Sequence, residues 1–148
     1  MKIVAATAEM VPFLLVRVDA KRLSSMAVSM GGDPRTIIAD SIARSTFTWC
    51  AMADDGPVWL GGVEPIPERP GCGYVWQTVT PALAQHRDDY LLASQAVMAE
   101  MHAVYPALYA WIEADNDAAL KHILRMGGTV GPVVVRNGIN MRLCERSV

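Results

Sequence analysis

The sequence is poor in the residues that hold small secreted or metal-stapled domains together. It has 3 cysteines among 148 residues and no Cys-x-x-Cys pair, which is too few for a disulfide framework and gives no sign of a zinc site. Its 11 glycines and 9 prolines exclude a collagen-like or low-complexity chain, and 52% apolar residues exclude a disordered one. We therefore expect a single domain over residues 1–148, in a reducing intracellular setting.

Long apolar runs are also missing. No segment reaches the roughly 18 uninterrupted apolar residues that a membrane-spanning helix needs. The apolar start at residues 3–6 is followed by Glu9, Pro12 and Arg17, so we predict no export signal and no membrane contact. A strong positive excess is absent as well. The net charge of −2 argues against binding along a nucleic-acid backbone.

The charges that are present are unevenly placed. From residue 121 onward five cations face Glu145 alone, so this stretch carries +4 and the rest of the chain, whose total is −2, carries −6. The five cations are Lys121, Arg125, Arg136, Arg142 and Arg146. A solvated face is the simpler interpretation, and an anionic ligand or an acidic partner surface is the alternative.

Hydrophobic periodicity predicts an α+β order of elements. Helices are expected over residues 8–18, 21–30, 34–45, 86–104 and 116–126. Strands are expected over residues 2–7, 46–52, 58–63, 74–79, 108–112, 130–135 and 139–144, with 108–112 buried on both faces. This order predicts a mixed, mostly antiparallel sheet with helices on both faces.

Local signals support several of these boundaries. Gly31-Gly32 ends the second predicted helix, because glycine accepts the left-handed cap conformation. Asp33-Pro34 supplies an N-cap and a first helical residue for the third helix. Asn137-Gly138 is a strong signal for a tight hairpin between the last two strands. The four tryptophans all fall on predicted strands, where core packing is the simpler role than base stacking.

One segment carries a family resemblance. Asn116-Asp117-Ala118-Ala119, followed by Ile123 and Met126-Gly127-Gly128, resembles a segment of the GCN5-related N-acetyltransferase (GNAT) superfamily, whose order of elements is also similar. Gly62-Val63-Glu64-Pro65 and Tyr105-Pro106-Ala107-Leu108 further resemble small phage-encoded acetyltransferase-like proteins. Some of those are internal virion or head-assembly proteins. The resemblance implies a GNAT-like domain located in a virion or in the cytoplasm of a bacterial host.

The resemblance also implies where acetyl-CoA would lie. In active members the coenzyme occupies a wedge between two parallel strands, and its pantetheine amides bond the edge of the first strand, here Gln77, Thr78 and Val79. Its diphosphate binds at the N-terminus of the long helix, here Gln85, His86 and Arg87. Asn116 contacts the coenzyme in active members, although the residue type equally suits the N-cap of the following helix.

The sequence departs from the family pattern at three positions. Asp88 and Tyr90 stand where the phosphate loop has glycines, and Ile123 stands where a tyrosine protonates the leaving thiolate. A carboxylate beside a diphosphate costs on the order of 1–4 kcal/mol for each close pair of charges. These departures predict a degenerate coenzyme site.

Catalytic candidates remain if the chain is active. A general base would be a carboxylate or histidine near the amine, and the candidates are Glu64, Glu113 and His86. Substitutes for the missing tyrosine acid are Tyr90, Tyr109 and Cys50. No metal site is predicted, because His102 and His122 have no second ligand at metal spacing.

Three functions therefore stay open. The first is a GNAT-fold virion structural or assembly component with a degenerate coenzyme site and no cofactor. The second is an active acetyl-CoA-dependent N-acetyltransferase, whose acceptor amine would be set by the helices within residues 8–45. The third is a module that binds coenzyme A without turnover. The sequence identifies neither the acceptor nor the oligomeric state.

Overall fold

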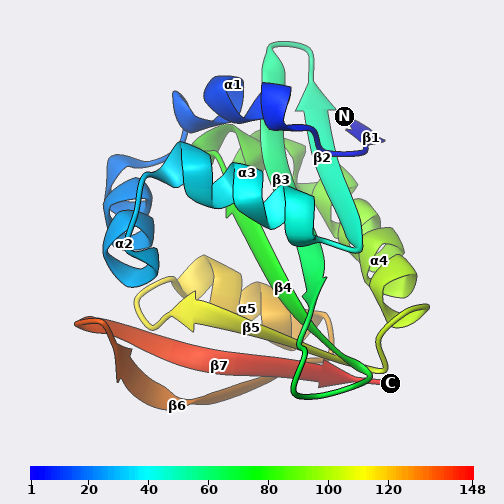
Figure 1. Ribbon diagram of the computed structural model, residues 1–148. Helices are drawn as coiled ribbons and strands as arrows, with labels where there is room; N and C mark the ends of the chain where they lie inside the picture. The colour runs from blue at the N-terminus through cyan, green and yellow to red at the C-terminus, as the bar shows by residue number, and fades with distance from the viewer.

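The computed structural model describes residues 1–148 and is built around one seven-stranded sheet of order β1-β2-β3-β4-β5-β7-β6 (Figure 1). All neighbouring strands are antiparallel except β4 and β5, which are parallel. The strands are β1 (Lys2–Val4), β2 (Phe47–Ala53), β3 (Gly56–Pro65), β4 (Cys72–Val79), β5 (Ala107–Glu113), β6 (Thr129–Arg136) and β7 (Ile139–Ser147). The predicted fold class, a mixed and mostly antiparallel sheet, is confirmed.

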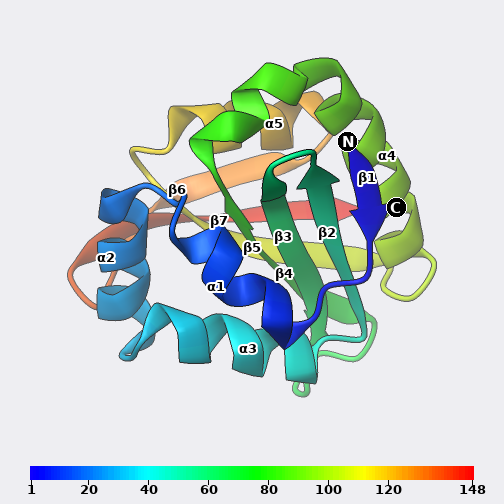
Figure 2. The same cartoon turned by 90° about the horizontal axis from the view of Figure 1, so that it is seen from above.

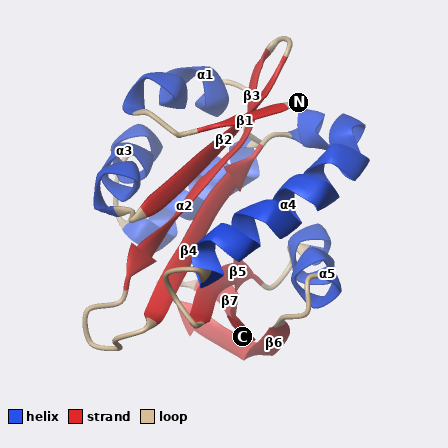
Figure 3. Cartoon of the chain, turned by 90° about the vertical axis from the view of Figure 1, so that its right-hand side faces the viewer, coloured by secondary structure: helices blue, strands red, loops and turns tan.

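Helices cover both faces of this sheet. They are the 3-10 turns η1 (Ala8–Met10) and η2 (Pro81–His86) and the helices α1 (Val11–Leu15), α2 (Ala20–Met30), α3 (Pro34–Arg44), α4 (Arg87–His102) and α5 (Asp117–Arg125). Figures 2 and 3 show α1 and α3 on one face and α4 and α5 on the other. None of these helices combines the length and the apolar character needed to cross a membrane.

Each face has its own apolar core. The core under α4 contains Trp49, Trp59 and Val97, and the core under α1 and α3 contains Leu14, Ile38 and Leu60. The two sets alternate along β2 and β3, as expected for strands whose successive side chains point to opposite faces. The sheet is therefore the middle of three layers, with α4 packed on one face and α1 and α3 on the other.

The local signals act as expected. Gly31 has φ +71° at the end of α2, and the Asp33 side chain accepts a hydrogen bond from the Thr36 backbone N–H at 3.2 Å. Asn137 and Gly138 have φ +50° and +81°, the pair of positive angles that a tight hairpin requires. These residues therefore specify boundaries that the structure confirms.

Three predicted features are wrong in detail. The helix over residues 8–18 is divided into η1 and α1, with Pro12 in the first turn of α1. The loop proposed for residues 64–73 is shorter, because pairing between β3 and β4 extends from Pro65 to Gly73. Strand β5 is buried on one face only. Its Tyr109 and Trp111 are half-exposed beneath the guanidinium groups of arginines, because a strand face can also be covered by long cationic side chains.

The cysteines provide a chemical test of this fold. Cys50 and Cys144 are buried, and burial raises the pKa of both thiols, that of Cys50 to about 11. Because the thiolate is the reactive form, we expect iodoacetamide to label the half-exposed Cys72 first. Peptide mass spectrometry after labelling of the native protein at pH 8 measures the alkylation rate of each of the three cysteines. Equal labelling of all three thiols before unfolding would contradict the burial described here.

Candidate functional site

The parallel strands β4 and β5 form a wedge. They are paired only from Cys72 and Ala107 to Tyr74 and Tyr109, and beyond these residues the two strands diverge. In Figure 1, β4 rises steeply while β5 stays nearly level with β7. Two diverging parallel strands leave backbone hydrogen-bonding groups without a partner strand.

Strand alternation identifies the groups on β4 that face the wedge. The Thr80 N–H bonds to the carbonyl of Val58 on β3 at 3.0 Å, and the register between β3 and β4 is unbroken. Backbone groups alternate in direction along a strand, so the even-numbered residues of β4 bond to β3. Val75, Gln77 and Val79 therefore direct their backbone groups into the wedge. Of the three predicted residues at 77–79, the middle one is bonded to β3 instead.

The same argument applies to β5. The Ala114 N–H bonds to the carbonyl of Asn140 beside β7 at 2.8 Å, in register with the rest of the β5–β7 pair. Even-numbered residues of β5 therefore bond to β7, and Trp111 and Glu113 direct their backbone groups into the wedge. On the β5 side these groups have partners within the chain, because the Glu113 carbonyl accepts from the Asn116 N–H at 3.0 Å and the Trp111 backbone is hydrogen-bonded to the Tyr74 side chain. The groups without a partner strand lie on β4.

The predicted phosphate-binding segment has a different local structure. Residues 81–86 form the 3-10 turn η2, which continues directly into α4, and no glycine occurs between residues 81 and 90. Asp88 and Asp89 lie in the first turn of α4, and the Asp89 carboxylate lies 3.7 Å from the amino group of Met1. The positive end of the α4 dipole is therefore next to the protein's own carboxylates.

An aromatic bridge crosses β4 on the α4 face. It consists of Trp59 on β3, Tyr90 on α4 and His122 on α5. The Trp59 and Tyr90 rings are 4.8 Å apart and nearly perpendicular, and the Tyr90 and His122 rings are 4.6 Å apart and stacked. Trp59 is paired with Val79, beyond the point where β4 and β5 diverge, so the contact chain from β3 to α5 crosses the α4 face beside the unpaired part of β4.

Polar contacts hold this aromatic bridge in place. The Trp59 Nε1–H donates to the Gln77 side-chain oxygen at 2.9 Å, a bond that leaves the backbone groups of Gln77 unengaged. Burial raises the pKa of Tyr90 to about 12, partly offset by Ser94, so its phenol stays neutral at physiological pH. Tyr90 therefore packs between α4 and the sheet as a neutral ring.

His122 gives the aromatic bridge a pH dependence. Burial, followed by the nearby charge of Arg125, lowers the pKa of His122 below its ordinary value of 6.5. The unfolded chain binds this proton more readily, so the contribution to stability is complete above about pH 6.5 and is lost as the pH falls through the folded-state pKa. We expect the melting temperature to fall on acidification. His122→Phe should remove this part of the pH dependence. If the melting temperature of the variant fell on acidification as much as that of the natural protein, this role of His122 would be contradicted.

Two of the three candidate general bases, Glu64 and Glu113, are bound by arginines, and His86 lies apart at the start of α4. The Arg44 Nε–H donates to Glu64 at 2.6 Å, and Arg22 donates to Glu113 at 2.9 Å. Arg22 also pairs with Asp115 at 3.1 Å, and Lys21 donates to the same carboxylate. An incoming amine would have to displace a guanidinium group from either glutamate.

The Arg22 and Lys21 contacts also connect α2 to the end of β5. A second connection joins the Asn137 side-chain N–H to the carbonyl of Ser29 at 2.7 Å, between the β6–β7 turn and the end of α2. Burial raises the pKa of Tyr74, which lies on this face; the charge of Arg136 acts in the opposite direction. The face from which the acceptor would approach is thus covered by α2 and its contacts.

The remaining predicted residues have separate surroundings. The Asn116 side chain accepts a hydrogen bond from the Ala119 N–H at 3.3 Å and so caps α5. Gln85 and Arg87 are exposed, and His86 is the N-cap residue of α4 without a capping side-chain bond. The structure brings Gln77 and Tyr90 together through Trp59, and it places Glu64 and Glu113 in two other ion-paired environments.

Strand β4 offers backbone groups of the kind that pantetheine would use. The aromatic bridge crosses β4 on the α4 face, and two carboxylates lie in the first turn of α4. The bridge residues Trp59 and His122 were not predicted, because their positions along the sequence give no sign that Tyr90 joins them. No group of three histidine, cysteine or acidic side chains is placed to hold a metal ion. Two surface pockets, of about 420 and 350 Å³, lie away from the wedge.

Solved structures of acetyltransferases share this architecture. A ribosomal-protein-alanine N-acetyltransferase from Brucella melitensis matches with a TM-score of 0.72, 11% identity and complete coverage of both chains. Ard1 from Thermoplasma volcanium has a TM-score of 0.73 at 10% identity, covering 99% of this chain and 97% of its own. A ribosomal L7/L12 alpha-N-protein acetyltransferase in complex with coenzyme A has a TM-score of 0.70 at 14% identity. The match covers 99% of this chain and 93% of that acetyltransferase.

At these identities the similarity establishes the fold, which is the GNAT fold. No protein-family model matches the sequence, and no curated protein matches it.

Proposed function

We propose that this chain uses the GNAT fold as a non-catalytic scaffold in a protein assembly. The observation that supports the proposal is the aromatic bridge of Trp59, Tyr90 and His122, which crosses the α4 face beside the unpaired part of β4. A coenzyme entering there would have to separate two ring contacts and the hydrogen bond between Trp59 and Gln77.

Charge at the start of α4 supports the same proposal. A diphosphate needs unpaired N–H groups and no competing anion at a helix N-terminus. Here Asp88 and Asp89 precede the bridge residue Tyr90 within the first turn. Each carboxylate close to a phosphate costs on the order of 1–4 kcal/mol, which is comparable to the whole free energy of a millimolar complex, about 4 kcal/mol.

Calorimetric titration with acetyl-CoA tests the closed site. We expect no saturable heat at a ligand concentration of about 1 mM. A matched variant combining Asp88→Gly with Tyr90→Ala removes one carboxylate and opens the bridge, and it should show more heat than the natural protein. Submillimolar binding by the natural protein would overturn the closed-site proposal.

The assembly role follows the resemblance to phage proteins. The segments that carry it, Gly62-Val63-Glu64-Pro65 and Tyr105-Pro106-Ala107-Leu108, lie on β3 and at the start of β5. We expect the protein in procapsids or mature particles of a source virus, detected by mass spectrometry. Absence from both kinds of particle would contradict the assembly role and leave the closed-site result unaffected.

An active N-acetyltransferase is the second candidate, and the wedge is the observation in its favour. Val75, Gln77 and Val79 direct backbone groups into it, as strand-edge binding of an amide chain requires. Release of free thiol from acetyl-CoA in the presence of small amines and peptide N-termini distinguishes the candidates. Turnover above the uncatalysed rate would favour this second function over the scaffold.

A further inference from the structure

The two ends of the molecule carry opposite charge. None of the five cations from residue 121 onward belongs to an ion pair; all six ion pairs of the chain involve other residues. Arg136 lies over the Trp111 ring at 4.2 Å, and Arg142 and Arg146 donate to backbone carbonyls. The end formed by α5, β6 and β7 therefore has an excess of positive charge, because only Asp117 and Glu145 on these elements oppose the five cations.

The same end has an exposed apolar strand. Strand β6 is the outermost strand of the sheet, and its Val133, Val134 and Val135 are 47%, 42% and 66% exposed. We call these three residues the valine edge. An edge strand with consecutive exposed valines and no charge among them is a surface that favours contact with another protein. The bond from Asn137 to Ser29 places the end of α2, with the exposed Met30, beside it.

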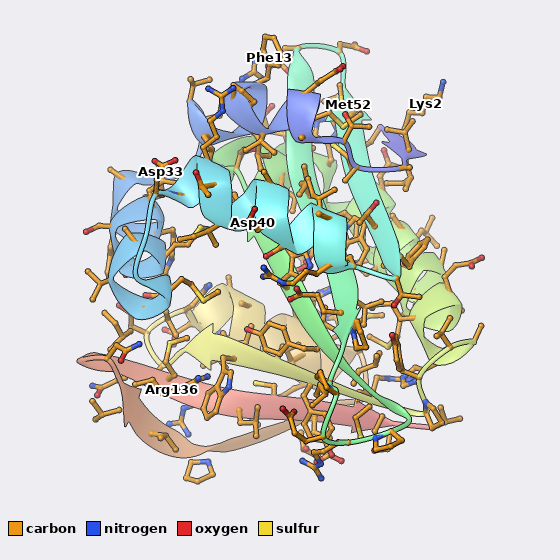
Figure 4. The ribbon with its side chains drawn as sticks, in the orientation of Figure 1. Lys2, Phe13, Asp33, Asp40, Met52 and Arg136 are labelled. Atoms are coloured by element: carbon orange, nitrogen blue, oxygen red, sulfur yellow. The ribbon has the colours of Figure 1, made fainter.

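A pocket lies at the opposite end, between α1 and the β2–β3 turn. It has a volume of about 420 Å³, and its apolar lining comes from Met10, Phe13, Val16, Met52 and Pro57. Phe13 and Val16 are 67% and 81% exposed. We call this the α1 pocket. In Figure 4, Phe13 and Met52 lie at one end of the molecule and Arg136 lies toward the other.

The charged lining of the α1 pocket has a negative excess of one. Glu9 and Asp55 line it together with Arg17, and Asp55 is paired with Arg17 at 3.2 Å, whereas Glu9 forms no ion pair. The α1 pocket thus combines exposed apolar side chains with the unpaired carboxylate of Glu9. The valine edge combines exposed apolar side chains with unpaired guanidinium groups.

We propose that copies of this chain associate head to tail, with the valine edge of one copy seated on the α1 pocket of the next. The two surfaces are different, so the contact is heterologous and leaves one free surface at each end of a dimer. Two-fold pairing between valine edges is disfavoured, because it would bring two basic ends together. The proposal does not depend on whether acetyl-CoA binds.

Light scattering of the purified full chain tests the contact. We expect the average mass of the natural protein to rise with concentration and to fall when salt screens the charges. Phe13→Glu alters only the pocket and Val135→Glu only the edge, both at exposed residues. Each variant should be monomeric. An equimolar mixture should form a dimer, since one variant supplies an intact edge and the other an intact pocket.

Leu92→Glu, at a residue of α4 that is 68% exposed, is the matched control and should associate like the natural protein. Val16→Glu and Val133→Glu replace the first pair if circular dichroism shows that either is unfolded. Glu9→Lys should weaken association roughly tenfold. A natural protein that stays monomeric, a mixture that forms no dimer, or a Phe13→Glu variant that still dimerises would overturn the proposal.

Discussion

Gly61→Ala is expected to destabilise the protein by about 3 kcal/mol or more. A Cβ atom at this position of β3 would lie 2.4 Å from the Trp49 ring and 2.7 Å from the backbone carbonyl of Trp76. The carbonyl belongs to the neighbouring strand β4, and Trp49 is among the largest fully buried side chains. The Trp76 carbonyl cannot move without displacing the sheet, and the Trp49 ring cannot move without displacing the core. The loss of stability is therefore due to overpacking that side-chain repacking does not relieve.

Urea unfolding followed by tryptophan fluorescence measures this effect. Gly32→Ala is the matched control, because its nearest neighbour to the new Cβ is an Ile37 side-chain carbon at 3.7 Å, an ordinary contact. We expect the control to change the free energy of unfolding by less than about 0.5 kcal/mol. Similar midpoints for the two variants would contradict the close approach of Trp49 to β3.

Tyr90→Ala is expected to cost about 3 kcal/mol of stability. The ring fills the space between Trp59 and His122, and its removal leaves a cavity and breaks two ring contacts at 4.8 and 4.6 Å. An edge-to-face aromatic pair contributes about 0.5–1.5 kcal/mol beyond its buried area, which is included in this expectation.

Thermal unfolding monitored by circular dichroism compares this variant with Tyr90→Phe. The phenylalanine variant keeps the ring and loses only the hydroxyl group, whose neighbour is Ser94. We expect it to stay within about 1 kcal/mol of the natural protein. If the alanine variant were equally stable, the aromatic bridge would not pack beside the unpaired part of β4 as described.

Local sequence signals predict most of the fold. Asn137-Gly138, Asp33-Pro34 and Gly31 act through the conformation of one or two residues, so they specify turns and helix ends without knowledge of distant contacts. The strands and helices have strong apolar periodicity and appear where predicted. The errors concern the helix divided at α1, the shorter loop between β3 and β4, and the half-covered strand β5. All three depend on neighbouring elements that a local pattern does not contain.

The candidate site is predictable only in part. The resemblance to acetyltransferases correctly indicates diverging parallel strands, and the sequence alone shows that Asp88 and Tyr90 replace glycines. The aromatic bridge could not be predicted, because Trp59, Tyr90 and His122 belong to three elements that meet only in the folded chain. The backbone directions on β4 likewise depend on the register with β3, which fixes which residues face the wedge.

We propose that side chains of the protein itself close the coenzyme groove of this GNAT fold. Titration of the isotope-labelled protein with acetyl-CoA, followed through the backbone amide resonances, tests this closure at single residues. If the groove is closed, the amide resonances of Gln77, Val79 and Arg87 keep their positions at a ligand concentration of about 1 mM. Saturable shifts of these resonances, together with those of Tyr90 and His122, would show that the groove is open.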